Sequence, residues 1–416
     1  QCGADAERPC AHARTVDAKA TRQGFIHDDC ARIQAETRQF DVLVVGAGPA
    51  GCVLASRLSE VASVSVCLVE AGNDILPGSE PPDVSDPLPI AAAIPGLSWS
   101  DLQADVTVQP STARMLRVRK FTQGRGIGGG SLINGSFAYR GQPDDYDGWE
   151  EAGATGWGWA SVLPFFRKLE NDLDRDDELH GSVGPMPVRR EPRNDWPPFS
   201  AFMASEMERK GYSWLDDYNG QFTDGFAAAP MANLPDRRFP TSSVYLGRDV
   251  RQRPNLTILT GIEADRLLFE GTQVVGITGT SPAGQVSLMA REVVLSCGAL
   301  FTPALIQRSG IGPAAVLDAA GVTTRADLSG VGRNLMNHPK IDVACYLPRR
   351  SRQSADMRAI GQFCARYSSG MSDCKPHDMG LLAISGLWLV TNLGGGFEAL
   401  ITYPYLEALG HPHHED

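Results

Sequence analysis

One stretch of the sequence, residues 40–72, constrains the fold more than any other. It opens with an apolar and mostly β-branched run, Val42 to Val45, which is typical of a buried strand. The pattern G-x-G-x-x-G follows at once, with its glycines at Gly46, Gly48 and Gly51. Residues 52–58 then carry apolar side chains at helical spacing. This order predicts a strand that passes through a glycine turn into a helix.

The glycines of this turn have separate physical roles. Gly46 permits a tight turn, Gly48 lets the backbone approach a pyrophosphate, and Gly51 lets the helix pack closely on the strand. A second predicted strand, residues 64–69, delivers Glu70 19 residues after Gly51. A carboxylate there accepts hydrogen bonds from both ribose hydroxyls and repels a 2′-phosphate. The unit predicts a dinucleotide site at the helix N-terminus, and it leaves FAD and NAD both open.

Composition excludes several classes of protein. The 416 residues are 42% hydrophobic and 21% charged, which indicates a globular chain of one large domain or two. The net charge of -11 argues against nucleic acid or an anionic membrane as a partner. No apolar run approaches the length of a membrane span, and no signal peptide is apparent, so we expect a soluble protein.

The spacing of the nine cysteines does not indicate a disulfide framework. None are paired as C-x-x-C, and Cys52, Cys67 and Cys297 fall in apolar segments, where cysteine usually acts as a small buried side chain. This pattern favours a reducing cytoplasm. The chain begins at Gln1 rather than Met, which suggests a fragment or a processed product.

Two segments near the start carry no predicted site. Residues 1–39 are polar, with a short helix predicted over 28–39, and we treat them as an N-terminal extension. Residues 73–101 are rich in Pro, Gly and Ser and lack periodicity, which predicts a long surface connection. Such a connection is either functional or a plain excursion over the surface.

A second glycine-rich stretch covers residues 124–135. Its many glycines expose consecutive backbone amides, and they let the chain lie flat against a large planar ligand. Arg125 offers a charge to a phosphate, and Asn134 offers a donor and an acceptor to the edge of a heterocycle. A flexible linker is the alternative, but the embedded Arg and apolar residues favour a binding loop.

It is here that the chain resembles the glucose-methanol-choline (GMC) flavin oxidoreductases. Residues 124–147 read GRGIGGGSLINGSFAYRGQPDDYD and look like the first signature of that family. Residues 298–312 read GALFTPALIQRSGIG and look like its second signature. The resemblance runs from about Phe40 to about residue 385.

The resemblance implies a fold and a cofactor. The fold is α/β, with a doubly wound, Rossmann-like FAD-binding domain and a second α+β substrate domain that is incomplete at the C-terminus. We expect the FAD-binding domain to comprise residues 40–170 and 240–338, and the partial substrate domain to comprise 171–239 and 339–416. By family analogy the backbone of Ala264, where relatives usually have valine, contacts the adenine side. The expected cofactor-binding residues are Gly46, Gly48, Pro49, Ala50, Gly51, Glu70, Ala71, Gly72, Arg125, Gly128, Gly129, Gly130, Ser131, Asn134, Gly135, Ser136, Phe137, Ala264 and Gly298.

Other segments match the family without suggesting a catalyst. Three tryptophans, Trp149, Trp157 and Trp159, precede an amphipathic helix around residues 163–169, and we expect them to pack in the core. His180 begins an HGxxGP segment, where we expect a turn residue. The motif at residues 331–339 has Asn337 where the family has Asp.

The terminal histidines, His411, His413 and His414, lie in a stretch with no family pattern, so we expect a frayed tail and no metal site.

The family chemistry is the oxidation of an alcohol: a histidine accepts the hydroxyl proton while hydride passes to the flavin. The H-x-x-G-T-C-type segment that carries this histidine does not occur in the 416 residues, so the catalytic residue stays unknown and we expect no alcohol turnover by this chain. The alternatives are a truncated or non-catalytic flavin-binding relative, a hydroxynitrile lyase within the family, and an NAD-dependent reductase.

Relatives that attach the flavin covalently have a histidine at the position that Ile133 occupies here, so we expect non-covalent FAD. The expected partner is a small alcohol. The particular alcohol, the electron acceptor and the oligomeric state stay open.

Overall fold

The computed structural model describes residues 39–105, 118–335, 337, 347–354, 356–358, 360–372 and 374–384. Several expectations concern residues outside these ranges. The helix expected over 28–39 lies outside them except for Gln39, which belongs to a strand. His338 and the terminal histidines also lie outside the described residues.

The centre of the fold is a six-stranded sheet with the order β10-β2-β1-β13-β12-β11. Its first four strands run parallel, and the last two continue the sheet as an antiparallel meander. The strands are β1 (Gln39–Val45), β2 (Val66–Val69), β10 (Leu256–Leu259), β11 (Glu263–Glu270), β12 (Gln273–Ser281) and β13 (Gly284–Leu295). Strands β12 and β13 pair as an antiparallel hairpin.

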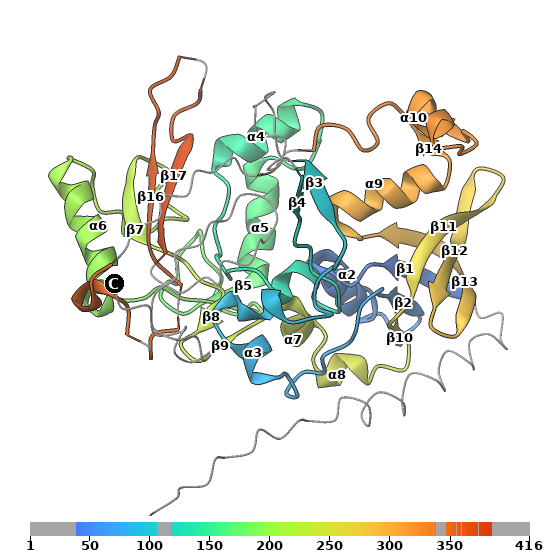
Figure 1. Ribbon diagram of the computed structural model, residues 1–416, viewed down its shortest axis with the longest axis horizontal. Helices are drawn as coiled ribbons and strands as arrows, with labels where there is room; N and C mark the ends of the chain where they lie inside the picture. The colour runs from blue at the N-terminus through green and yellow to red at the C-terminus, as the bar shows by residue number, and fades with distance from the viewer. Residues whose placement is uncertain are drawn as a thin grey trace, which may run out of the picture.

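Helices cover both faces of this sheet, as Figure 1 shows. Alternate residues of β1 point to opposite faces: Leu43 packs in a cluster that includes Leu305 of α9 (Gly298–Arg308), whereas Val44 packs with Cys52 of α2 (Pro49–Leu58). A parallel sheet buried on both faces needs strands of almost unbroken apolar residues, as the run of β1 is. The doubly wound α/β fold expected from the sequence is therefore confirmed.

A second, antiparallel sheet has the order β17-β16-β7 and lies at the far end of the molecule from β11 and β12 (Figure 1). Its strands are β7 (Gly225–Ala228), β16 (Gly361–Tyr367) and β17 (Met379–Ile384). Helix α6 (Pro198–Arg209) packs on it through Ala204 and Met207, which lie in one cluster with Phe226 and Phe363. This sheet joins β7, which lies between β2 and β10 in the sequence, with β16 and β17, which follow β13. The domain boundaries themselves stay a prediction.

Short elements connect the two sheets. The remaining helices are α3 (Pro82–Ser85), α4 (Pro143–Glu151), α5 (Trp159–Leu169), α7 (Thr241–Tyr245), α8 (Arg248–Arg251) and α10 (Ala314–Ala319). Single 3₁₀ turns occur at Pro89–Ala93, Gly129–Leu132, Arg193–Asp195 and Arg349–Ser351. Two-stranded pairs are formed by β3 (Gln103–Asp105) with β4 (Val118–Lys120), β5 (Glu170–Asp172) with β6 (Met186–Val188), β8 (Asn233–Leu234) with β9 (Arg237–Arg238), and β14 (Ile311–Gly312) with β15 (Ala326–Asp327).

Burial bears on two of the sequence expectations. Of the two alternatives for residues 73–101, a plain excursion over the surface is excluded, because Val84, Ala91 and Leu97 form a buried cluster with Leu132 of the glycine-rich stretch 124–135, called the glycine loop below. Trp149 and Trp157 are not core residues, since they are 51% and 56% exposed and contact each other at the surface. Apolar periodicity finds the helical segments but does not show which side chains remain uncovered.

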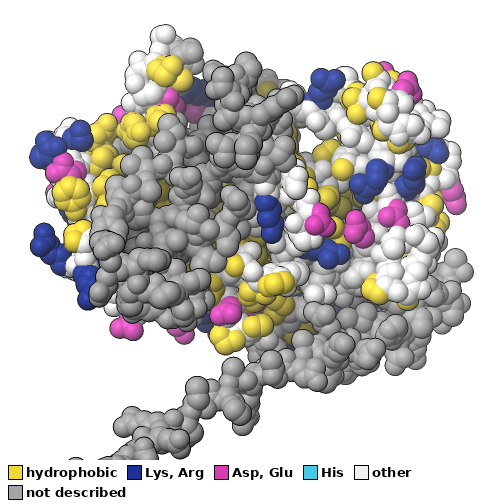
Figure 2. All heavy atoms as spheres, in the orientation of Figure 1, with side chains coloured by type: hydrophobic (Ala, Val, Ile, Leu, Met, Phe, Trp, Pro, Cys, Tyr) yellow, Lys and Arg dark blue, Asp and Glu magenta, His cyan; other side chains and the backbone are white. Residues whose placement is uncertain are grey.

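The described surface is mixed in charge. On the face shown in Figure 2, basic and acidic side chains are interspersed among apolar ones. Among the described helices none is long and apolar enough to cross a membrane.

Candidate functional site

The glycine turn between β1 and α2 has the geometry expected from its sequence. Gly46 has φ of 96°, a left-handed conformation that favours glycine. A Cβ on Gly51 would overlap the carbonyl oxygen of Gly46, which confirms that Gly51 permits close contact of helix and strand. Gly48 is the N-cap of α2 and Pro49 is its first residue, and no side chain caps this end. The first amides of α2 therefore face the space beyond the strands.

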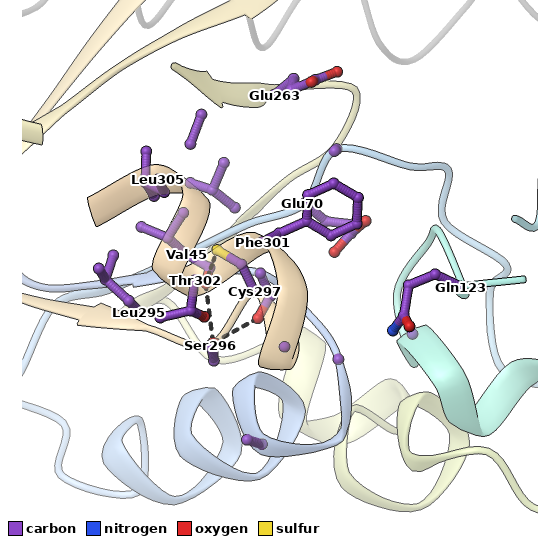
Figure 3. A pocket seen from close by; sticks show the side chains of 18 of the residues that line it. Val45, Glu70, Gln123, Glu263, Leu295, Ser296, Cys297, Phe301, Thr302 and Leu305 are labelled. Carbon is purple, nitrogen blue, oxygen red and sulfur yellow. Dashed lines mark hydrogen bonds between the residues drawn. The ribbon is translucent and has the colours of Figure 1, made fainter. Parts of the chain in front are cut away.

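A second segment, the turn between β13 and α9, packs against the glycine turn that follows β1. Ser296 follows β13 and donates its hydroxyl to the carbonyl oxygens of Val45 at 3.1 Å and Gly46 at 2.7 Å. The thiol of Cys297 donates to Val45 at 3.2 Å. Figure 3 shows these bonds between the β13–α9 turn and the end of β1. Residues about 250 positions apart thus form one surface.

Glu70 lies at the end of β2, as predicted, and is only 7% exposed. Its Oε2 accepts the amide of Ala47 at 2.9 Å, and its Oε1 accepts the amides of Gly72 at 2.8 Å and Gly126 at 3.0 Å. Burial raises the pKa of this carboxyl, and the three amides oppose that effect. The sequence suggested a ribose acceptor alone. The structure adds a second role, because Glu70 also joins the glycine turn to the glycine loop.

The glycine loop packs directly on the glycine turn. The amide of Gly128 donates to Ala47 at 2.7 Å, and a Cβ on Gly129 would lie 2.7 Å from the Cα of Gly48. Gly128 and Gly129 both have positive φ, of 110° and 51°. Glycine is therefore required here for two reasons, the backbone conformation and the close approach of two chains.

These segments enclose a cavity of about 510 Å³ at the carboxyl ends of the parallel strands. Open α/β sheets bind ligands at this edge, and the volume falls within the usual range of cofactor pockets. The predicted residues that line it are Gly46, Gly48, Pro49, Ala50, Glu70, Ala71, Gly129, Gly130, Ala264 and Gly298.

The sequence matches one known protein family over most of its length. The model of the GMC oxidoreductase family matches residues 40–340. The chain belongs to the GMC oxidoreductase family. FAD is the cofactor of these flavoproteins and is therefore the cofactor of this chain.

Two relatives and one solved structure illustrate the GMC match. The chain is 38% identical to 5-(hydroxymethyl)furfural oxidase of Methylovorus sp. (strain MP688) over 84% of its own length and 67% of that protein. It is 37% identical to oxygen-dependent choline dehydrogenase of Pseudomonas aeruginosa (strain UCBPP-PA14) over 75% of its length and 56% of that protein. The structure of pyridoxine 4-oxidase from Mesorbium loti aligns with a TM-score of 0.70 and 32% identity, covering 80% of this chain and 64% of that one. The chain thus spans between about half and two thirds of these GMC proteins.

The cavity residues fit the GMC cofactor. Uncapped helix amides suit a pyrophosphate, and a buried carboxylate at the end of the second strand suits a ribose. A Cβ on Gly130 would meet no protein atom within 4 Å, so the loop presents bare backbone toward open space. The thiols of Cys297 and Cys52 lie near the cavity and stay protonated at neutral pH, because burial raises the pKa of Cys297 to about 11 and that of Cys52 to about 12. A protonated thiol is a poor nucleophile, so neither is expected to react with a bound cofactor.

Nine of the predicted GMC cofactor residues do not line the cavity. These residues are Gly51, Gly72, Arg125, Gly128, Ser131, Asn134, Gly135, Ser136 and Phe137. The Arg125 guanidinium lies over the Trp99 ring at 4.7 Å. The Ser131 hydroxyl donates to Gly128 at 2.6 Å and lies 2.9 Å from that of Thr241, while Phe137 stacks on Tyr139 in the core beside the second sheet.

Sequence reasoning missed Arg238, which supports the end of the glycine loop. Arg238 is 2% exposed, and its Nη2 donates to the backbone oxygen and side chain of Asn134 and to Ser136. Burial lowers the pKa of this guanidinium to about 10, so it stays charged at neutral pH. Ser136 has φ of 57°, which costs about 1–3 kcal/mol in a residue with a side chain. Arg238 therefore holds a strained turn that local sequence patterns do not reveal.

Further residues of the cavity wall were also not predicted. They come from the 73–101 connection, the start of the glycine loop, β11 and α9: Trp99, Gln123, Glu263, Phe301, Thr302 and Arg308. Figure 3 shows that Phe301, Thr302 and Leu305 come from α9, whose sequence matches the second GMC signature. The second GMC signature was therefore the sequence signal from which the cavity residues of α9 could have been predicted.

Proposed function

We propose that this chain holds FAD non-covalently in the cavity at the ends of β1, β2 and β13, as part of an oxidoreductase that acts on the CH–OH group of an alcohol. The observation that carries the proposal is the convergence of the uncapped end of α2, Glu70 and the glycine loop on one cavity. The family match supports the same assignment.

Each predicted group has a role in this proposal. The amides after Gly48 hold the pyrophosphate, Glu70 faces the ribose with the acceptor capacity that its three amides leave free, and the backbone of Ala264 lies on the adenine side. The glycine loop orients the flavin ring. FAD, when bound, supplies the hydride acceptor for alcohol oxidation. The protein excludes water and fixes the position of the cofactor.

The substrate class follows from the relatives. Their names point to 5-(hydroxymethyl)furfural, choline and pyridoxine, so we propose a small alcohol. We also propose the domain division stated above, with the substrate bound between the glycine loop and the second sheet. The H-x-x-G-T-C-type segment does not occur in the sequence, and of the described histidines neither His180 nor His377 lines the cavity. A flavin-binding chain without alcohol turnover is therefore the second candidate.

The experiment separates these candidates. Purified protein is incubated with FAD, freed of excess ligand and measured by visible absorption; a colourless protein contradicts the FAD site. The yellow protein is then mixed without oxygen with 5-(hydroxymethyl)furfural, choline and pyridoxine in turn. Rapid bleaching of the flavin band by one of them supports alcohol oxidation and identifies its substrate class. A flavin band that persists with all three supports the second candidate.

A further inference from the structure

A buried group of charges lies outside the cavity, around His180. The ring of His180 is 1% exposed and touches three carboxylates. Its Nε2 lies 2.8 Å from Asp217, and its Nδ1 lies 3.2 Å from Glu170 and 3.1 Å from Asp172. His180 does end a turn, since its amide donates to the carbonyl oxygen of Asp177 at 3.3 Å, but its side chain also lies at the centre of an ionic network that the sequence did not predict.

Two buried arginines share these carboxylates. Arg190 places Nη1 2.7 and 2.8 Å from the two oxygens of Asp172, and Arg140 pairs with Glu170. Three buried carboxylates thus face two buried guanidinium groups, which leaves one negative charge. A third arginine, Arg175, has its Nε 3.6 Å from Asp217 without a hydrogen bond, and its side chain is 24% exposed, so it neutralises this carboxylate only in part. One further buried positive charge is needed, since an unpaired buried charge is costly.

A proton supplies this charge better than a metal ion does. Glu170, Asp172 and His180 are close enough together to bind a metal. However, Oε1 of Glu170 already accepts from Arg140, and both oxygens of Asp172 accept from Arg190. A divalent ion at this point would place two charges beside two guanidinium groups. A proton on each ring nitrogen of His180 gives one charge, with Nε2 donating to Asp217 and Nδ1 facing Glu170 and Asp172.

We propose that His180 is held as an imidazolium at neutral pH, and that this charge positions Arg140 and the chain that leaves the glycine loop.

The positioning follows a closed path of contacts. Asp217 binds the ring of His180 and accepts the amide of Asn219 at 3.0 Å. The side chain of Asn219 accepts the amide of Arg140 at 3.1 Å and donates to the carbonyl oxygen of Ala138 at 2.9 Å. The Arg140 guanidinium returns to Glu170 beside His180 and donates to the carbonyl oxygen of Leu179 at 2.6 Å. The segment leaving the glycine loop is thus held at Ala138 and Arg140 by its backbone and at Arg140 also by its side chain.

The charged groups around the His180 ring determine whether its pKa is raised or lowered. Burial alone lowers the pKa of His180, but its bonds to Asp172, Asp217 and Glu170 outweigh burial and raise the pKa to about 10. The other charged neighbours are Arg140, Arg175 and Arg190, with Arg167 on the carbonyl oxygen of His180, Asp177 on its amide and Asp174 beside Arg190. A raised pKa means that the stabilisation is full below the unfolded value near 6.5 and is lost as pH rises through about 10.

The first test uses the unaltered protein. Long-range ¹H–¹⁵N spectra of ¹⁵N-histidine-labelled protein distinguish a ring with two protons from neutral rings and from metal-bound rings. At pH 8.5 an ordinary histidine is almost entirely neutral. We expect one doubly protonated ring, unaltered by EDTA and absent from the His180→Gln protein. Only neutral rings, or a signal that EDTA changes, would overturn the proposal.

The second test follows thermal unfolding between pH 6 and 10.5. His180→Gln should lower the unfolding temperature at pH 7 more than the control His377→Gln, which removes a half-buried histidine paired with Asp224. The difference between the unaltered and His180→Gln proteins should shrink as pH approaches 10. A difference independent of pH would show a merely packing role and contradict the proposal. If His180→Gln does not fold, Asp217→Asn should move the doubly protonated signal, and an unmoved signal would rule out His180.

Discussion

Ser296 donates its hydroxyl to the carbonyl oxygen of Gly46 at 2.7 Å, and this bond joins the ends of two adjacent parallel strands. The same contact leaves no room for a side chain. A Cβ on Gly46 would lie 2.7 Å from the Ser296 carbonyl oxygen and 2.8 Å from the Cα of Cys297. Both obstacles are backbone atoms, which cannot turn aside as a flexible side chain does.

Gly46→Ala should therefore destabilise the fold. The positive φ costs about 1–3 kcal/mol and the overlap a similar amount. The matched control is Gly284→Ala, because Gly284 has φ of 120° with nothing within 4 Å of its Cβ position. Urea unfolding of both proteins measures the difference. Equal losses for the two variants would show that the contact with Ser296 has no energetic weight.

Gly48→Ala should affect the cofactor rather than the fold. Gly48 has φ of -66°, which any residue adopts, and a Cβ there would meet only the Ser296 carbonyl oxygen, at 3.9 Å. The new methyl group would occupy cavity space where the pyrophosphate is proposed to lie. We expect FAD affinity to fall by roughly tenfold or more, about 1.4 kcal/mol. Flavin titration checks this, with Gly330→Ala as a control in open space; a normal affinity for Gly48→Ala contradicts the proposed location.

Glu70→Ala should weaken FAD binding by about 1–3 kcal/mol, the usual cost of unmet charged hydrogen bonds. Sequence reasoning alone predicts no loss of stability. The three amides on Glu70 change that expectation, since the Ala variant leaves all three unpaired in a buried place. We therefore expect the cofactor-free variant to melt earlier as well, with Glu70→Gln intermediate. Calorimetry of the cofactor-free proteins measures the melting temperatures. Identical values for the unaltered and variant proteins would contradict the role of Glu70 in joining the glycine turn to the glycine loop.

Arg238→Met should loosen the end of the glycine loop. Methionine fills much of the buried space but donates nothing to Asn134 and Ser136, so we expect a loss of about 1–3 kcal/mol in the free energy of unfolding. Arg237→Met is the control, because the neighbouring Arg237 is exposed and lies over the ring of Phe239. Denaturant unfolding without FAD measures both. Equal stability of the two variants would contradict the support role of Arg238.

The flavin should come off the protein without bond cleavage. Ile133 occupies the position at which covalent relatives have histidine, and its side chain offers no nucleophile. Acid precipitation should leave all yellow colour in the supernatant. A coloured pellet after washing would demonstrate a covalent link and identify a different attachment residue.

Local sequence patterns predicted much of the site. The strand run before Gly46, the glycine spacing and Glu70 all lie in one short stretch, so periodicity and turn chemistry were sufficient to find them. They were not sufficient to give the strand order, because β13 reaches its place beside β1 through pairing that spans most of the chain. Residues of the cavity wall such as Trp99 and Phe301 were missed for the same reason.

The least predictable residues were the buried charged ones. Arg238 has unremarkable sequence neighbours, and the HGxxGP segment around His180 predicts only a turn. Each residue acquires its role from a partner far away in the chain, Asn134 for Arg238 and Asp217 for His180. Local signals also misjudged exposure, as Trp157 shows, because an aromatic residue beside a helix signal does not say whether another element covers it.

The bond between Ser296 and Gly46 also has a consequence for biosynthesis. The two residues are 250 positions apart, and a ribosome adding about 5–20 residues per second needs roughly 10 to 50 s to produce the second after the first. During that interval the emerging β1–α2–β2 unit has the amides for a pyrophosphate but not the segment on which the glycine turn rests. Nascent chains should therefore capture FAD late, after β13 has left the exit tunnel and inserted beside β1.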